Sequence, residues 1–174
     1  LGNGASELIA MATNGLLNDG DELLLPAPDY PLWTAVTTLS GGKPVHYLCD
    51  EDNDWNPNLD DIRSKISKNT KAIVVINPNN PTGTWLSGPD IEAFLASVPP
   101  EVVVVLDEAY NEYLPPAQRH DSVAWLKKYP NLLISRTFSK VYGLAGLRVG
   151  FGLMAPALAD LINRVRQPFN VNSL

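Results

Sequence analysis

The sequence is organised around Ile134-Ser-Arg-Thr-Phe-Ser-Lys-Val-Tyr-Gly-Leu-Ala-Gly-Leu-Arg-Val-Gly150. An apolar strand predicted over Asn131 to Ser135 carries this stretch out of the protein interior. Lys140 follows soon after the strand, and an ammonium group beside apolar structure is costly to desolvate. We therefore expect desolvation to favour the neutral, nucleophilic form of the Lys140 amine.

Hydrogen-bond donors lie on both sides of this lysine in the sequence. Thr137 and Ser139 supply hydroxyls before it, and Arg148 follows it among small residues that let a ligand approach. These donors suit a phosphate ester, and an amine beside them suggests a Schiff base with a phosphorylated aldehyde. That is the chemistry of pyridoxal phosphate. An isolated Ser-Lys pair would more simply be a surface lysine before a glycine-rich turn, so the other motifs decide.

Length and composition describe one globular domain. The chain has 174 residues, 45% of them hydrophobic and 18% charged. A net charge of -6 argues against a nucleic-acid partner. The single Cys49 excludes an internal disulfide, and no run is apolar enough for a membrane span or a signal peptide, so we expect a cytoplasmic chain without a membrane partner. The abrupt ends suggest a fragment of a longer protein.

Strand-like and helix-like patterns alternate along the chain. We expect strands at 21–25, 44–48, 71–76, 101–106, 131–135 and 149–153, and helices at 8–17, 32–39, 59–66, 89–98, 122–129 and 155–166. This alternation predicts an α/β fold with a doubly wound, mostly parallel sheet and right-handed crossovers. In the helix at 122–129, Val123 and Trp125 are expected to pack inward, and His120 before it is expected to be solvated.

Two of the predicted strands end in polar motifs. The strand at 71–76 runs into Asn77-Pro-Asn-Asn-Pro-Thr-Gly83, which places Asn80 where open α/β sheets bind ligands. Asp107 stands at the end of the strand at 101–106, where a buried carboxylate needs a cationic partner. An aspartate that caps the following turn is the alternative for this motif alone.

Two further motifs lie in the first part of the chain. Gly2 to Ser6 reads as a small-residue turn before a helix, whose free N–H groups favour an anion, although Ser6 as an ordinary N-cap is the alternative. Prolines hold the segment from Pro26 to Pro31 rigid, so that Tyr30 is well placed to stack on an aromatic ring. Plain core packing is the alternative for Tyr30.

Together these motifs resemble the fold-type I aminotransferases, the aspartate aminotransferase superfamily. The resemblance rests on Ser-x-Thr-Phe-Ser-Lys-x-Tyr-Gly-Leu-Ala-Gly-Leu-Arg-x-Gly, Asn-Pro-Thr-Gly and Asp-Glu-Ala-Tyr, and it covers essentially all 174 residues. It implies the pyridoxal-phosphate-binding large domain, residues 1–174, without the N-terminal arm and the C-terminal small domain. It also implies a homodimer.

The resemblance assigns roles to the motif residues. It implies that Lys140 carries the cofactor and moves the α-proton, and that Asp107 pairs with the pyridine nitrogen. Asn80, supported by Asn77, and Tyr110 would bind the phenolic oxygen. Tyr30 would stack on the ring. The residues implied for the phosphate are Gly4, Ala5, Ser6, Thr137, Ser139 and Arg148. No metal is expected, and we expect the Asn80–Pro81 peptide bond to be cis.

The expected reaction is transfer of an amino group between an amino acid or amine and a 2-keto acid. Residues up to about Trp85 resemble alanine aminotransferases, whereas those from about Pro99 resemble histidinol-phosphate aminotransferases, so a natural intermediate and an engineered chimera both remain open. A lyase or decarboxylase on the same scaffold is one alternative, and a non-catalytic cofactor-binding fragment is another. A dinucleotide-binding fold is a third, but Gly2-Asn-Gly lacks a preceding strand and the later glycine of that fingerprint.

Overall fold

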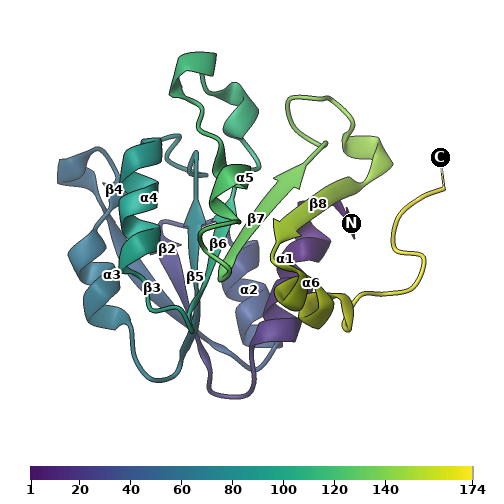
Figure 1. Cartoon of the computed structure of the whole chain (residues 1–174), viewed down its shortest axis with the longest axis horizontal. Coiled ribbons are helices and arrows are strands. Elements are labelled where there is room, and N and C mark those ends of the chain that lie inside the picture. Colours follow the sequence, from purple (N-terminus) through teal and green to yellow (C-terminus); the bar gives the residue numbers. More distant parts are fainter. Residues whose placement is uncertain (174) are drawn as a thin grey trace.

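A computed structural model describes residues 1–173 as an α/β structure built on one eight-stranded sheet (Figure 1). The strand order is β1-β8-β7-β6-β5-β2-β3-β4. The strands are β1 (Gly2–Asn3), β2 (Glu22–Ala27), β3 (Lys43–Asp50), β4 (Asn56–Pro57), β5 (Thr70–Ile76), β6 (Val103–Asp107), β7 (Leu132–Thr137) and β8 (Val149–Met154).

The centre of the sheet is parallel and its edges are antiparallel. β3, β2, β5, β6 and β7 pair in parallel, whereas β8 pairs antiparallel with β7 and β1, and β4 pairs antiparallel with β3. The central strands are continuous apolar runs, as expected where both faces of a sheet are covered. The predicted mostly parallel α/β fold is therefore confirmed.

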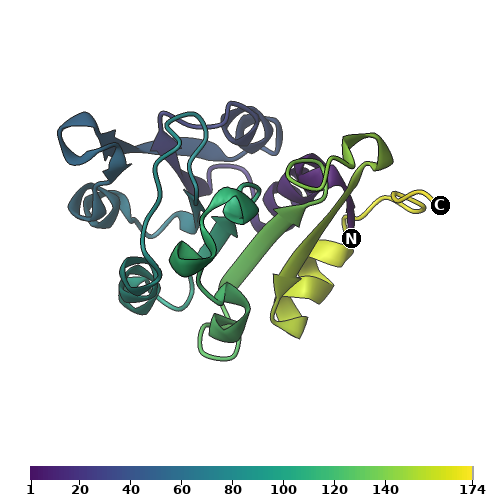
Figure 2. The same cartoon turned by 90° about the horizontal axis from the view of Figure 1, so that it is seen from above.

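Six helices within residues 1–173 cover the two faces of the sheet (Figures 1 and 2). They are α1 (Gly4–Leu16), α2 (Leu32–Leu39), α3 (Leu59–Lys65), α4 (Gly88–Ser97), α5 (Ser122–Trp125) and α6 (Pro156–Asn163). Residues of α3, α4 and α5 pack in one apolar cluster, and residues of α1, α2 and α6 pack in another. The fold is thus a three-layer structure with two cores.

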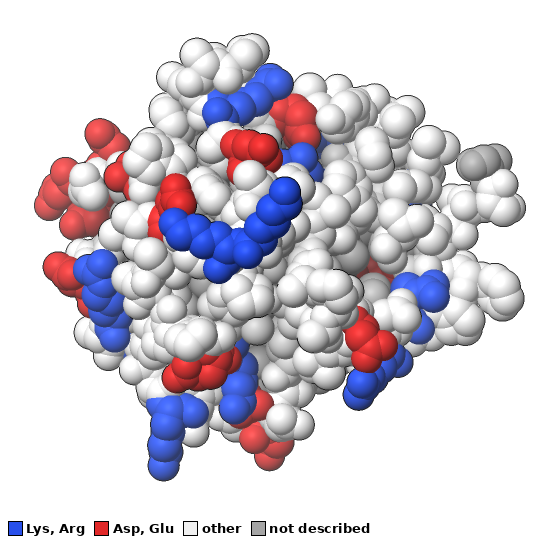
Figure 3. Space-filling model, in the orientation of Figure 1, with Lys and Arg blue, Asp and Glu red and all other residues white. Residues whose placement is uncertain are grey.

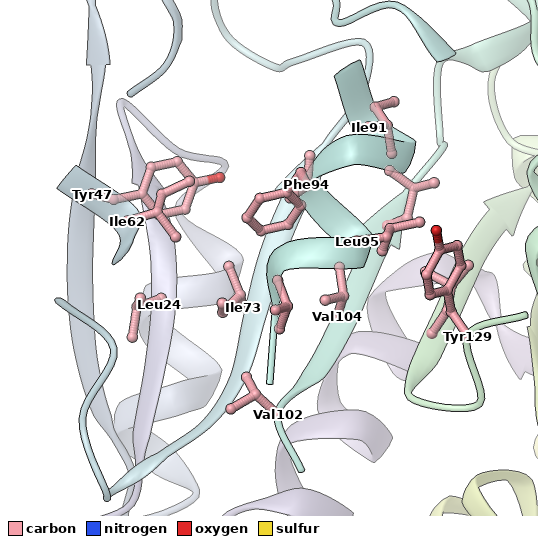
Figure 4. Close-up of a cluster of buried hydrophobic side chains, with 14 of the residues drawn as sticks. Leu24, Tyr47, Ile62, Ile73, Ile91, Phe94, Leu95, Val102, Val104 and Tyr129 are labelled. Carbon is pink, nitrogen blue, oxygen red and sulfur yellow. The ribbon is translucent and has the colours of Figure 1, made fainter. Parts of the chain in front are cut away.

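Successive residues of each central strand enter opposite cores. Val104 and Leu106 of β6 lie in the cluster under α4, whereas Val105 between them lies in the cluster under α1 and α2. Figure 4 shows the first cluster, in which Phe94 and Leu95 of α4 lie over the strands. The same alternation decides on which face of the sheet the residues just beyond the end of β6 lie.

The predicted elements are found within a few residues of their expected bounds, with three corrections. The turn expected at Gly2 to Ser6 is wrong, because Gly2 and Asn3 form β1 and α1 already begins at Gly4. The helix expected at 122–129 is shorter, since α5 ends at Trp125. Val123 does not pack inward but is 40% exposed, whereas Trp125 packs against the core as expected. No helix within the described residues is long and apolar enough to cross a membrane.

Candidate active site

A cavity of about 280 Å³ opens at the carboxyl ends of the central parallel strands. It is lined by side chains that follow β5, β6 and β7 together with the start of α1. The lining residues are Ala5, Ser6, Ile9, Tyr30, Ile76, Asn80, Asp107, Ala109, Tyr110, Thr137, Ser139, Lys140, Ala145 and Arg148. All of the predicted site residues except Gly4 are therefore brought together, in the place where open α/β sheets bind ligands.

Asp107 forms the floor of the cavity as a buried carboxylate. Its residue is only 4% exposed, and its Oδ1 accepts hydrogen bonds from Ser135 Oγ at 2.9 Å and from the backbone N–H of Ala109 at 3.2 Å. Trp33 Nε1 donates to Oδ2 at 3.4 Å. Burial raises the pKa of Asp107, and these hydrogen bonds oppose the rise. Within residues 1–173 no lysine, arginine or histidine pairs with this carboxylate.

Asn80 and Tyr110 form a polar pair on one side of the cavity. Asn80 Nδ2 donates to Tyr110 Oη at 3.0 Å, although the two residues lie on different loops. The Asn80–Pro81 peptide bond is cis, which confirms the prediction, and the Asn77–Pro78 bond is cis as well. Asn77 supports this loop, because its side chain exchanges hydrogen bonds with the backbone of Leu86.

Lys140 presents its amine to this pair. Its Nζ lies 5.1 Å from the centroid of the Tyr110 ring, close enough for a cation–π contact. Lys140 is nevertheless exposed, so the expected desolvation is wrong for this chain. The reason is its position, because β7 ends at Thr137 and the lysine lies beyond it, on the loop that leads to β8.

The amino end of α1 and Arg148 lie next to each other in the wall of the cavity. The backbone N–H of Gly4 donates to the Arg148 carbonyl at 3.0 Å, and a Cβ atom at Gly4 would lie 2.7 Å from Arg148 Nη2. Gly4 also has a φ of +70°, so only glycine suits this point without strain. Arg148 makes no ion pair within residues 1–173. A guanidinium and a helix N-terminus together favour an anion.

Two hydroxyls continue this anion-favouring wall. Thr137 is buried at the end of β7, and its Oγ1 accepts a hydrogen bond from the backbone N–H of Ser139 at 3.1 Å. The Oγ of Ser139 is buried without a hydrogen-bond partner among the described residues. A buried hydroxyl without a partner is costly, so Ser139 is poised to bind a polar ligand atom.

Tyr30 also lines the cavity. It is 38% exposed, which argues against the alternative that it simply packs in the core. The loop that carries it follows β2 and includes a cis Ala27–Pro28 bond. Its ring is available to a ligand in the cavity.

Sequence reasoning gave no site role to several residues that shape this cavity. Trp33 and Ser135 hold Asp107, and a Cβ atom at Gly150 would lie 2.7 Å from the backbone N of Ala5. His120 was expected to be solvated, but its side chain is only 9% exposed because its ring stacks on Trp125. Within residues 1–173 no cluster of three or more histidine, cysteine or acidic residues is arranged to hold a metal ion.

Known proteins match this chain over its full length. Histidinol-phosphate aminotransferase 2 of Ralstonia nicotianae is 49% identical over 174 residues, which are 100% of this chain and 46% of that protein. The match runs through the region between Trp85 and Pro99, where the resemblance to alanine aminotransferases was expected to end. This chain spans about half the length of the curated relatives it matches.

Solved structures show the same fold. Histidinol-phosphate aminotransferase from Sinorhizobium meliloti, in complex with pyridoxal-5'-phosphate, has a TM-score of 0.89 at 28% identity and covers 98% of this chain and 45% of that one. Alanine aminotransferase from Pyrococcus furiosus has a TM-score of 0.85 at 35% identity, covering 94% and 43%. A family model described as aminotransferase class I and II matches residues 1–174. The chain therefore belongs to the aminotransferase class I and II family.

Proposed function

We propose that this chain binds pyridoxal phosphate and transfers an amino group between an amino acid or amine and a 2-keto acid. The observation that carries the proposal is the cavity itself. It joins an amine, a buried carboxylate that has no cationic partner among residues 1–173, and an anion-favouring wall within one space. Related proteins with this fold include one solved with pyridoxal-5'-phosphate.

The anion-favouring wall fits the phosphate of the cofactor. Among residues 1–173, Arg148 has no carboxylate partner, and Ser139 Oγ is buried without a hydrogen bond. A phosphate ester carries negative charge that would pair with the Arg148 guanidinium, and its oxygens would accept a hydrogen bond from Ser139 Oγ. Its other proposed ligands are Gly4, Ala5, Ser6 and Thr137.

The floor of the cavity fits the pyridine ring. Asp107 is buried, and a protonated ring nitrogen would supply its missing cation. Asn80 and Tyr110 already bond to each other and would both turn a polar hydrogen towards the phenolic oxygen. Tyr30 would stack on the ring. The residues present therefore fit the group.

Bound in this way, pyridoxal phosphate supplies an electron-withdrawing ring that stabilises negative charge at the substrate α-carbon. Lys140 Nζ would hold the cofactor by its aldehyde group, and the same amine, once free, would remove the substrate α-proton as general base. Asp107 would hold the ring nitrogen in its protonated form. The ring of Tyr110 lies 5.1 Å from Lys140 Nζ in the same cavity and would orient the amine through this cation–π contact.

The relatives suggest a substrate class, but among the described residues the cavity offers no spare cationic group that would select among substrates. The protein from Ralstonia nicotianae is a histidinol-phosphate aminotransferase, and we propose histidinol phosphate or alanine as the amino donor. The only cationic side chains that line the cavity within the described residues are Lys140 and Arg148, and both have roles towards the cofactor. None is left to bind a substrate carboxylate or phosphate. We therefore expect selectivity to reside in a further domain, and residues 1–174 to form the cofactor-binding large domain.

Single-turnover transamination tests this function. The chain loaded with pyridoxal phosphate is mixed with alanine, glutamate or histidinol phosphate, and keto product and carbon dioxide are measured. We expect keto product from all three donors, with rates within about tenfold, or about 1.4 kcal/mol, of each other. Carbon dioxide without keto product would identify a decarboxylase, and no product from a loaded chain would identify a non-catalytic binding fragment. Strong discrimination among donors would instead place selectivity within this chain.

Arg148→Gln should weaken cofactor binding. Loss of the guanidinium leaves the phosphate short of a charge-assisted hydrogen bond worth about 1.5–3 kcal/mol, which corresponds to roughly one to two decades in Kd. The measurement is a titration with pyridoxal phosphate. Arg164→Gln is the matched control, because Arg164 pairs with Asp160 on the surface of α6. Equal affinities of the two variants would show that Arg148 is not a phosphate ligand.

We also propose a cytoplasmic location and a homodimer, and the exposed loop between β7 and β8 supports the homodimer. Val141, Tyr142, Leu144 and Leu147 are 43%, 50%, 42% and 37% exposed. Figure 3 shows mostly uncharged surface over this loop. An apolar segment so close to the cavity is the kind of surface that a second copy covers.

A further inference from the structure

A second buried carboxylate lies directly beside Asp107 in the chain. Glu108 is 0% exposed and lines no part of the cavity. Because successive residues at a strand end point to opposite faces of a sheet, Glu108 lies on the α4 and α5 side and Asp107 on the α1 and α2 side. The proposed mechanism makes no use of Glu108.

Arg136 on β7 forms an ion pair with this second carboxylate. Its Nε donates to Glu108 Oε2 at 2.8 Å, and its Nη2 lies 2.8 Å from the same oxygen. Arg136 Nη2 also donates to the Oγ of Ser122, which is fully buried at the start of α5. The pair joins the ends of β6 and β7, which carry Asp107 and Thr137.

Besides Arg136, the only ion-pair partner of Glu108 within the described residues is His120. His120 Nε2 lies 3.4 Å from Glu108 Oε1, but that oxygen has no hydrogen-bond partner among these residues. On the cavity side, the cations near Asp107 are Lys140 and Arg148, and neither pairs with it. Arg136 is therefore the cation that hydrogen-bonds to Glu108, while no cation within the described residues pairs with Asp107.

The negative charge of Glu108 opposes the ionisation of Asp107. Burial raises the pKa of Asp107, hydrogen bonds from Ser135, Ala109 and Trp33 oppose the rise, and the negative charge of Glu108 raises the pKa further. The proposed function requires the opposite, an anionic Asp107 that pairs with a ring nitrogen. A cation bonded to Glu108 offsets the effect of the negative charge of Glu108 on Asp107.

We infer that Arg136 is a positioning residue for the active site: by neutralising Glu108 from the opposite face of the sheet, it keeps Asp107 anionic. The need for an anionic Asp107 in catalysis rests on the proposed function. The electrostatic link between Arg136 and Asp107 is measurable in the chain without cofactor, so the two ideas fail separately.

The test is a titration of the Asp107 carboxyl by NMR in the cofactor-free chain labelled with ¹³C-aspartate. The resonance is assigned by its absence from Asp107→Asn. We expect Arg136→Gln to raise the pKa of Asp107 by roughly one unit and Glu108→Gln to lower it by a similar amount. Arg136→Lys keeps the positive charge and should leave the value close to that of the original chain.

The opposite signs separate electrostatics from simple disruption. Both Gln variants break the same ion pair, so a merely structural role would admit water and lower the pKa of Asp107 in both. A fall or no change in Arg136→Gln would overturn the inference. If Arg136→Gln does not fold, Glu108→Gln is compared with Glu108→Gln/Arg136→Gln. The single variant, which keeps the cation, must then give the lower pKa, and equal or reversed values would overturn the inference.

Binding of pyridoxal phosphate, measured separately, tests the proposed function independently of the Asp107 titration. A chain that binds no pyridoxal phosphate would refute the proposed function and leave the Asp107 titration interpretable. A chain that binds it normally, with no shift of Asp107 in Arg136→Gln, would refute only the role of Arg136.

Discussion

Lys140→Ala should abolish transamination by the loaded chain. Lys140 is the only lysine that lines the cavity within residues 1–173, so no other amine there can bind the aldehyde carbon or remove the α-proton. Loss of a positioned general base alone lowers a rate by roughly 10²–10⁴-fold, and loss of the covalent link adds to this. The measurements are single-turnover keto-acid production and the visible absorbance of the lysine-bound cofactor.

Lys127→Ala is the matched control for this variant. Lys127 is an exposed lysine that follows α5 and does not line the cavity. It should retain both the rate and the absorbance of the original chain. A Lys140→Ala chain with an undiminished rate would show that another residue performs the chemistry.

Asp107→Asn should separate cofactor binding from chemistry. Asparagine keeps the shape of the side chain, and the proposed phosphate ligands on α1 and from the end of β7 onward are untouched, so the variant should still bind pyridoxal phosphate. It cannot hold a positive charge at the ring nitrogen. Loss of one preorganised electrostatic partner typically costs about 10²–10³-fold in rate, and we expect a loss of that order in removal of the α-proton.

Exchange of the α-hydrogen with deuterated water, followed by mass spectrometry of bound alanine, measures this step directly. Asp160→Asn is the control, because Asp160 is an exposed carboxylate paired with Arg164 on α6. Unchanged exchange in Asp107→Asn would show that Asp107 does not stabilise the charge that develops on the substrate.

The strand-end residues of the site were predictable from the sequence for a physical reason. Asp107 and Thr137 end apolar strands of adjacent β6 and β7, and parallel strands bring their carboxyl ends to one edge of the sheet. Lys140 follows the same edge. The roles given to Asn80 and Tyr110 came instead from family resemblance, because no local pattern predicts that two side chains on separate loops bond to each other.

The residues that escaped sequence reasoning act through contacts between distant segments. Trp33 reaches Asp107 across 74 positions of sequence, and a tryptophan in an apolar helix gives no sign of that bond. Glu108 and Arg136 each resemble an ordinary charged residue of a motif in the sequence, yet Arg136 forms an ion pair with a fully buried Glu108. His120 lies in a polar segment, and only the packing of Trp125 against it excludes water. The two-residue β1 is too short for any periodicity.

Borohydride reduction followed by peptide mapping tests the central claim most directly, namely that this cavity holds pyridoxal phosphate on Lys140. Reduction fixes the cofactor to whichever amine carries it, so the labelled peptide identifies the residue. We expect one labelled site, Lys140, in the original chain and none in Lys140→Ala. Label on Lys127, Lys128 or any other amine, at undiminished yield in Lys140→Ala, would contradict the claim.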